Sequence, residues 1–120
     1  MSLRVLVVDD DPDNADSLAL LLRLRGHDAR VAYDGAAALV SVKERPADVV
    51  LMDWAMPGLD GGELARRLRE EDGMRSALLV CVSGYGQDDD RRQAKEAGFD
   101  HHFTKPLFAD DLLGLLSSRQ

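Results

Sequence analysis

The chain has 120 residues, a formal net charge of −7 and a hydrophobic fraction of 45%, which are proportions of an ordinary folded protein rather than of a disordered one. The length favours a single domain across residues 1–120 with a sizeable core. The negative charge argues against direct binding of nucleic acid or of an anionic membrane surface. No apolar run approaches the roughly 18 residues of a membrane span and no secretory signal opens the chain, so we expect a cytoplasmic location.

Strands and helices are predicted to alternate along the chain. The strands are short apolar runs without polar alternation, and most of the helices place leucine or alanine at helical spacing. In chain order we predict a strand at 5–8, a helix at 12–25, a strand at 31–33, a helix at 35–45, a strand at 49–52, a helix at 62–71, a strand at 78–82, a helix at 87–97, a short strand at 101–103 and a last helix that includes 108–116. The helix at 87–97 offers only Ala94 and Ala97 as an apolar stripe, so we expect it to be lightly anchored.

Strands without polar alternation are typical of parallel sheets that are covered on both faces. Five repeats of strand and helix with short connections therefore predict a doubly wound α/β domain, in which helices flank both faces of a five-stranded parallel sheet. Ligands of such domains bind beyond the carboxyl ends of the strands, where the strand order reverses. The residues that follow each strand are accordingly the candidates for function.

Carboxylates follow two of the predicted strands. Asp9 and Asp10 come directly after the first strand, and Asp53 comes after the third. If these strands are neighbours, three carboxylates meet in one crevice, and their repulsion must be relieved by protonation or by a cation. Oxygen ligands of this kind favour a hard ion such as magnesium. The simpler reading is that Asp9, Asp10 and Asp11 only cap the first helix, but Asp53 ends a second strand independently and favours a functional cluster.

A hydroxyl and an ammonium are predicted at the same edge of the sheet. Ser83 follows the fourth strand and Lys105 follows the fifth. Each is weak evidence alone, because serine is common in turns and most lysines are solvated surface charges. Together with an acceptor carboxylate and a metal ion, they make the set of groups that phosphoryl transfer needs, since this chemistry depends on positioning and charge neutralisation.

Four segments of the chain resemble the receiver-domain signature of two-component response regulators, the superfamily of the chemotaxis receivers. They are Val7-Val8-Asp9-Asp10, the stretch at 53–61 with its Met56-Pro57-Gly58 turn, Val82-Ser83-Gly84 and Lys105-Pro106-Leu107. Their order and their places at strand ends make the combined signal specific, and the resemblance covers nearly the whole chain. It implies a flavodoxin-like fold with sheet order 2-1-3-4-5 and a cis peptide bond between Lys105 and Pro106.

The resemblance also implies a role for each site residue. Asp53 is similar to the phosphorylated aspartate, Asp10 to the direct metal ligand and Asp9 to its acidic neighbour. The backbone carbonyl of Ala55 corresponds to a third protein ligand of the metal. Ser83 resembles the switch hydroxyl and Lys105 the lysine that pairs with the phosphoryl group.

The implied function is a phosphorylation switch. The domain is expected to take a phosphoryl group from a phosphohistidine of a sensor histidine kinase or phosphotransfer domain onto Asp53, with Mg²⁺ or Mn²⁺ as cofactor. It would assist this step and the later hydrolysis without being otherwise an enzyme, although it could be part of a hybrid histidine kinase. Phosphorylation is expected to draw Ser83 inward and to shift 84–86 and the helix at 87–97, which would change the surface offered to a downstream effector.

Three positions depart from the family pattern. Ala55 provides no polar side chain near the acceptor, and Tyr85 is placed where its bulk could impede water or simply lie in an exposed loop. His102 stands three residues before Lys105, where relatives often carry tyrosine or phenylalanine. An aromatic switch of the usual kind is therefore not predicted.

Two other functions compete with the receiver interpretation. A phosphatase with an aspartate nucleophile uses Asp-x-Asp after a strand, a spacing that residues 9–11 satisfy, but Pro12 follows and the chain leaves no room for a substrate-selecting cap. A binding module could keep the fold without being phosphorylated. The complete set of Asp10, Asp53, Ser83 and Lys105 argues against that alternative.

Overall fold

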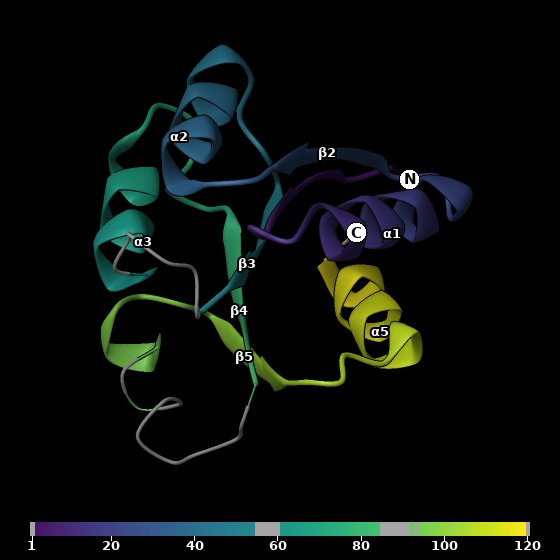
Figure 1. Cartoon of the computed structure of the whole chain (residues 1–120). Coiled ribbons are helices and arrows are strands. Elements are labelled where there is room, and N and C mark those ends of the chain that lie inside the picture. Colours follow the sequence, from purple (N-terminus) through teal and green to yellow (C-terminus); the bar gives the residue numbers. More distant parts are fainter. Residues whose placement is uncertain (1, 55–60, 85–91, 93, 120) are drawn as a thin grey trace.

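The computed structural model describes residues 2–54, 61–84, 92 and 94–119, which are drawn in colour in Figure 1. Its centre is one parallel sheet of five strands: β1 (Arg4–Val8), β2 (Asp28–Ala32), β3 (Val49–Asp53), β4 (Leu78–Ser83) and β5 (His101–Thr104). The strand order is β2-β1-β3-β4-β5, so the chain turns from one side of β1 to the other between β2 and β3. The predicted doubly wound fold and its strand order are confirmed, and the reversal point lies between β1 and β3.

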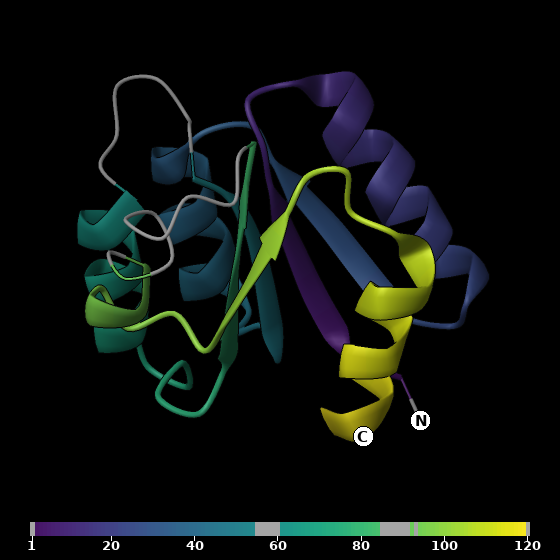
Figure 2. The same ribbon diagram turned by 90° about the horizontal axis from the view of Figure 1, so that it is seen from below.

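Helices cover both faces of the sheet. The described helices with complete bounds are α1 (Pro12–Leu24), α2 (Gly35–Glu44), α3 (Gly61–Glu70) and α5 (Ala109–Arg119). Figures 1 and 2 show α1 and α5 on one face and α2 and α3 on the other. Residues 94–96 are also helical, but most of the helix predicted at 87–97 lies outside the described residues, as does the turn at 56–58.

The central strands are buried on both faces because their side chains alternate between two cores. Val5 and Val7 enter the core under α1 and α5, whereas Leu6 and Val8 enter the core under α2 and α3. All four side chains are at most 2% exposed. This arrangement explains why the strands are continuous apolar runs in the sequence.

The second strand was predicted too late in the chain. It was expected at 31–33, whereas β2 begins at Asp28 and ends at Ala32. In the register of β1 and β2, Arg4 pairs with Asp28 and Val8 pairs with Ala32, so β2 pairs with β1 along its whole length. Because β2 is an edge strand, it tolerates the polar side chains of Asp28 and Arg30, which hid its first half from a search for apolar runs.

Aspartates cap two helices. The Asp11 side chain accepts a hydrogen bond from the Asp13 backbone N–H at 3.0 Å and begins α1, and Asp34 accepts from Ala37 at 2.7 Å and begins α2. Such caps pair backbone donors that the first helical turn leaves without partners. The cap of α1 is therefore Asp11, and neither Asp9 nor Asp10 is needed for it.

A hydrogen-bonded ion pair fixes the beginning of β5. Asp100 Oδ2 accepts from the Leu79 backbone N–H and from Arg69 Nη2, both at 2.8 Å. Arg69 Nη1 also donates to the carbonyl of Arg75 at 3.1 Å, so one guanidinium joins α3, the approach to β4 and the approach to β5. This anchor helps to set the position of β5, from which the chain continues to Lys105.

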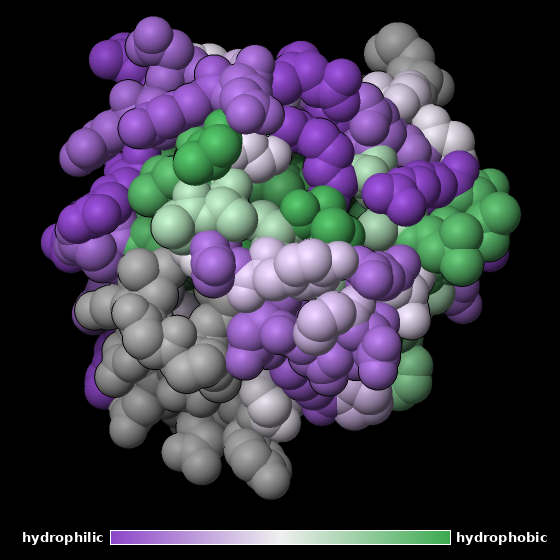
Figure 3. Space-filling view, turned by 45° about the horizontal axis from the view of Figure 1, so that its top comes forward, coloured by the Kyte–Doolittle hydropathy of each residue, from purple (hydrophilic) through white to green (hydrophobic). Residues whose placement is uncertain are grey.

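The surface carries both polar residues and exposed hydrophobic side chains (Figure 3). On the face seen in Figure 3, hydrophilic residues surround smaller apolar patches. The large hydrophobic side chains most exposed among the described residues are Leu24 at 74% and Phe108 at 64%. Within the same residues, no helix is both long enough and apolar enough to span a membrane.

Candidate functional site

Three carboxylates meet beyond the carboxyl ends of β1 and β3. One oxygen each from Asp9, Asp10 and Asp53 lies within 4.8 Å of the others. The Asp9 backbone N–H donates to the Ala32 carbonyl at 3.1 Å, and Asp9 Oδ1 accepts from the Asp11 backbone N–H at 2.9 Å. Hydrogen bonds therefore fix both the backbone and the side chain of Asp9. The structure thus brings together the three acidic side chains that the sequence singled out, at the predicted reversal point of the sheet.

Lys105 enters this cluster from the neighbouring strand connection. Its Nζ lies 3.0 Å from Asp53 Oδ2, and the Asp53 side chain is only 10% exposed. The Lys105 backbone N–H donates to the Ser83 carbonyl at 2.7 Å, and the following bond to Pro106 is cis, as the resemblance implied. The backbone at the ends of β4 and β5 therefore aims the ammonium at the candidate acceptor.

The electrostatics of the cluster favour a cation. Burial raises the pKa of Asp9 above its usual value, and the nearby charges of Asp53 and Asp10 raise this pKa as well. The hydrogen bond from the Asp11 backbone N–H and the charge of Lys105 act in the opposite direction but do not cancel the increase. Among the described side chains of the cluster, three carboxylates thus face one ammonium, an arrangement that a proton or a metal ion stabilises.

The donor set fits a hard divalent ion. Three carboxylate oxygens within reach of one another are ligands that Mg²⁺ prefers, and Mg²⁺ takes few protein ligands because it keeps several of its waters. The Asp10 side chain is exposed, which leaves room for such waters. The predicted third ligand, the backbone carbonyl of Ala55, lies outside the described residues, and so does Tyr85.

Ser83 is buried at the end of β4, with 2% of its surface exposed. Its Oγ lies 2.8 Å from Nε2 of His102, a hydrogen bond whose direction depends on the imidazole tautomer. From the sequence, Ser83 was expected at the site and His102 was noted only as a departure from the family pattern, so their contact was not predicted. The strand register explains the contact, because β4 and β5 pair Ser83 with Thr104, and His102 lies two residues earlier on the same face.

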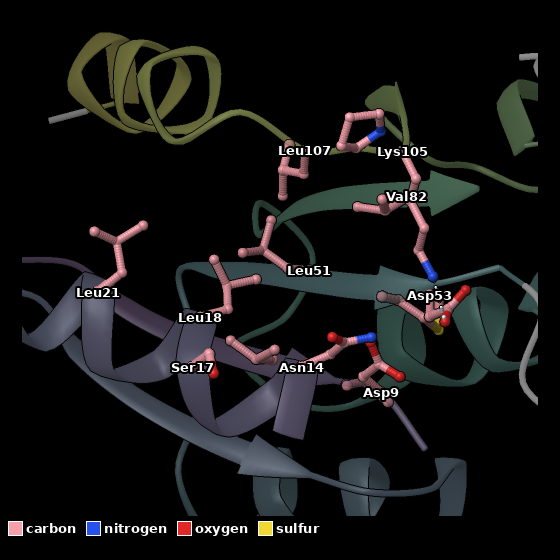
Figure 4. A pocket seen from close by; sticks show the side chains of 14 residues that line it. Asp9, Asn14, Ser17, Leu18, Leu21, Leu51, Asp53, Val82, Lys105 and Leu107 are labelled. Carbon is pink, nitrogen blue, oxygen red and sulfur yellow. Dashed lines mark hydrogen bonds and ion pairs between the residues drawn. The ribbon is translucent and has the colours of Figure 1, made fainter. Parts of the chain in front are cut away.

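A cavity of about 690 Å³ extends from the carboxylates along the face covered by α1 and α5. Figure 4 shows Asp9 and Asp53 at one end, with Lys105 reaching towards Asp53, and four leucines are among the residues that line the rest of the cavity. The labelled leucines are Leu18, Leu21, Leu51 and Leu107. The sequence did not predict this cavity, because its walls come from five separate segments that only the tertiary structure brings together.

Trp54 lies beside the site and can report changes there through its intrinsic fluorescence. It follows Asp53 directly, and its backbone N–H donates to the Val82 carbonyl at 2.9 Å. Its ring packs edge to face against the ring of Phe99, with 5.8 Å between the ring centroids. A Cβ added at Gly61 would lie 3.0 Å from the Trp54 ring, so the ring also packs closely on the beginning of α3. A change of charge or position at Asp53 is therefore expected to alter tryptophan fluorescence.

Asp10→Ala is expected to weaken Mg²⁺ binding by about tenfold or more, because it removes one oxygen ligand of a hard ion. The metal-free protein should become slightly more stable, since one source of repulsion with Asp9 and Asp53 disappears. A Mg²⁺ titration followed by Trp54 fluorescence measures the affinity. Asp13→Ala is the matched control, because it removes an exposed carboxylate of α1 that lies outside the cluster. Equal affinities in the wild type and Asp10→Ala would contradict the ligand role.

Comparison with known families agrees with this geometry. The family model of the response regulator receiver domain matches residues 5–117. The DNA-binding response regulator MtrA of Mycolicibacterium smegmatis is 35% identical over 119 residues, which cover 99% of this chain and 51% of that protein. The chain spans about half the length of the curated relatives it matches.

Solved structures show the same fold. The chemotaxis response regulator CheY4 of Vibrio cholerae superposes with a TM-score of 0.90 over 100% of both chains, at 22% identity. The receiver domain of sensor histidine kinase PA1611 from Pseudomonas aeruginosa has a TM-score of 0.86 and 26% identity, covering 98% of this chain and 97% of that one. That structure has a magnesium ion coordinated in its active site cleft.

Proposed function

The chain belongs to the response regulator receiver domain family, and we propose that its phosphoacceptor is Asp53. As a member of this family, it is a phosphoacceptor domain of two-component signalling. One observation carries the choice of residue: the 10%-exposed carboxylate of Asp53 lies both in the acidic cluster and 3.0 Å from the ammonium of Lys105. We propose residues 1–120 as one receiver domain.

The reaction we propose is an attack by an Asp53 carboxylate oxygen on the phosphorus of a phosphohistidine. The bond from phosphorus to the histidine nitrogen breaks, the nitrogen leaves with its electron pair, and an acyl phosphate forms on Asp53. Little covalent assistance is needed from the protein, so its contribution is to position the phosphoryl oxygens and neutralise their charge. Lys105 is already held where it can pair with one of these oxygens.

Asp9, Asp10 and Asp53 are the described residues that would hold Mg²⁺, or Mn²⁺ in its place. The metal ion supplies positive charge to the phosphoryl oxygens. Without it, three clustered carboxylates would repel an incoming phosphoryl group. Hydrolysis returns the site to its first state when water attacks the phosphorus and Asp53 leaves as a carboxylate.

Ser83 is proposed as the residue that registers phosphorylation. The new group carries up to about two negative charges and three acceptor oxygens, and the Ser83 hydroxyl can donate to one of them. Because Ser83 ends β4 and its carbonyl accepts from Lys105, a shift of Ser83 reaches β5 and the start of α5. The loop at 84–86 and the helix at 87–97, where the sequence predicts the largest response, lie largely outside the described residues.

The partners follow from the phosphoryl donor and the charge of the domain. We propose a sensor histidine kinase or a phosphotransfer domain as donor and a downstream effector domain or protein as recipient of the signal. With a net charge of −7, this domain is not expected to bind nucleic acid or membranes, so any DNA binding would belong to another domain. A cytoplasmic location is part of the same proposal.

Incubation with acetyl phosphate and Mg²⁺ tests the function. We expect intact-protein mass spectrometry to show one added phosphoryl group that hydroxylamine or base removes, because acyl phosphates are cleaved by both. Chelation of the metal with EDTA should prevent the addition. A protein that is never labelled would support the binding-module alternative.

Turnover of an external phosphate ester would instead favour the phosphatase alternative. That function needs the second carboxylate of Asp9-x-Asp11 as acid and base. Here the Asp11 side chain accepts from the Asp13 backbone N–H at 3.0 Å and caps α1. Because the Asp11 carboxylate already serves as the helix cap, it is poorly placed to act as acid and base. We therefore expect no turnover of phosphate monoesters such as p-nitrophenyl phosphate.

A further inference from the structure

The contact between Ser83 and His102 gives a histidine a direct connection to the switch hydroxyl. The two side chains are diagonal neighbours on one face of β4 and β5, and their polar atoms lie 2.8 Å apart. Ser83 is 2% exposed and His102 is half-buried, so little solvent reaches this hydrogen bond. Hydrogen bonds in such surroundings are stronger than those in water. Which of the two atoms donates therefore decides whether Ser83 can donate to another group.

The Ser83 hydroxyl has a single proton, which can be donated to only one acceptor. If Ser83 donates to Nε2 of His102, its proton is not available to a phosphoryl oxygen on Asp53. If Nε2 carries a proton and donates to Ser83 Oγ, the hydrogen bond is kept and the serine proton is free to point elsewhere. An imidazole can take either part, because each ring nitrogen is a donor or an acceptor according to tautomer and charge.

We propose that His102 is a positioning residue that donates from Nε2 to Ser83 Oγ in the phosphorylated state and thereby directs the Ser83 proton to the phosphoryl group. This inference rests on the proposed roles of Asp53 and Ser83. In the unphosphorylated state the same pair can hold the opposite direction, with Ser83 donating to Nε2. Phosphorylation then reverses the direction of an existing hydrogen bond, which a phenylalanine at position 102 could not provide.

Substitutions at position 102 separate this role from simple packing. His102→Gln keeps a polar group at about the reach of Nε2, His102→Asn ends closer to the backbone, and His102→Phe keeps a ring but offers neither donor nor acceptor. The measured quantity is the affinity for beryllofluoride, a phosphoryl mimic, in saturating Mg²⁺ by Trp54 fluorescence. The affinity for Mg²⁺ alone is measured in parallel and should not change, because it requires the carboxylates and a folded site but not Ser83.

We expect His102→Phe and His102→Asn to bind beryllofluoride about three- to tenfold more weakly than the wild type, the usual effect of losing one hydrogen bond. His102→Gln should stay within about twofold of the wild type, well below that loss. Because His102 acts through Ser83, adding His102→Phe to Ser83→Ala should cause no further loss. This non-additivity distinguishes a positioning role from an independent effect on packing.

Three outcomes would overturn the inference: unchanged beryllofluoride affinity in His102→Phe, an equal loss in His102→Gln and His102→Phe, or additive losses in the double variant with Ser83→Ala. Failure of the underlying function looks different. If wild-type protein does not bind beryllofluoride, or binds it equally well as Asp53→Asn, then the phosphoacceptor assignment fails and this inference fails with it.

Discussion

Asp53→Asn should abolish labelling by acetyl phosphate, with a signal at least about a hundredfold below that of the wild type. An asparagine has nearly the same shape as aspartate, but its neutral amide oxygen is a poor nucleophile and cannot form a stable acyl phosphate. The substitution also removes one charge from the cluster, so the pKa of Asp9, which Asp53 helps to raise, should fall towards its usual value. Intact-protein mass spectrometry after equal incubation measures the label.

Two control variants show whether the loss is specific to the acceptor. Asp13→Asn removes an exposed carboxylate of α1 outside the cluster and should be labelled normally. Asp10→Asn keeps the acceptor but impairs the metal site, so it should be labelled more slowly and recover at higher Mg²⁺ concentration. Labelling undiminished in Asp53→Asn, or a phosphoryl group mapped to Asp9 or Asp10 in the wild type, would contradict the assignment.

Much of this site could be predicted because it lies at strand ends. Strands such as Val49–Asp53 are buried on both faces, so their apolar runs are visible in the sequence, and a carboxylate at the end of one is conspicuous. Edge position weakens that signal. β2 begins at Asp28 and carries Arg30, and its first half was missed for that reason.

Contacts between strands were harder to predict, because they depend on register. The 2.8 Å contact of Ser83 with His102 requires that β4 pair with β5 and that Ser83 face Thr104, neither of which composition or periodicity determines. The sequence marked His102 only as a departure from a family pattern. The cavity beside the carboxylates is a similar case, since Leu18 and Leu107 both line it although they are distant in the chain.

Lys105 has two opposing effects on the site, and Lys105→Met should separate them. The methionine has a similar length but no charge. Transfer from acetyl phosphate should slow by about a hundredfold, the usual cost of removing one group that stabilises developing negative charge. Mg²⁺ should nevertheless bind several-fold more tightly to the unphosphorylated variant, because the ammonium 3.0 Å from Asp53 no longer opposes the cation.

The opposite signs make this variant informative, since damage to the fold would lower both quantities. Lys43→Met is the matched control, because it removes the same charge from α2, where Lys43 lies 3.7 Å from Glu71. It should change neither the transfer rate nor the Mg²⁺ affinity by more than about twofold, because exposed charges at a distance are screened by salt. Lys105→Arg keeps the charge and should leave the Mg²⁺ affinity close to that of the wild type. If Lys105→Met instead transfers at the wild-type rate, the ammonium does not stabilise the phosphoryl group, and the contact with Asp53 is only a structural ion pair.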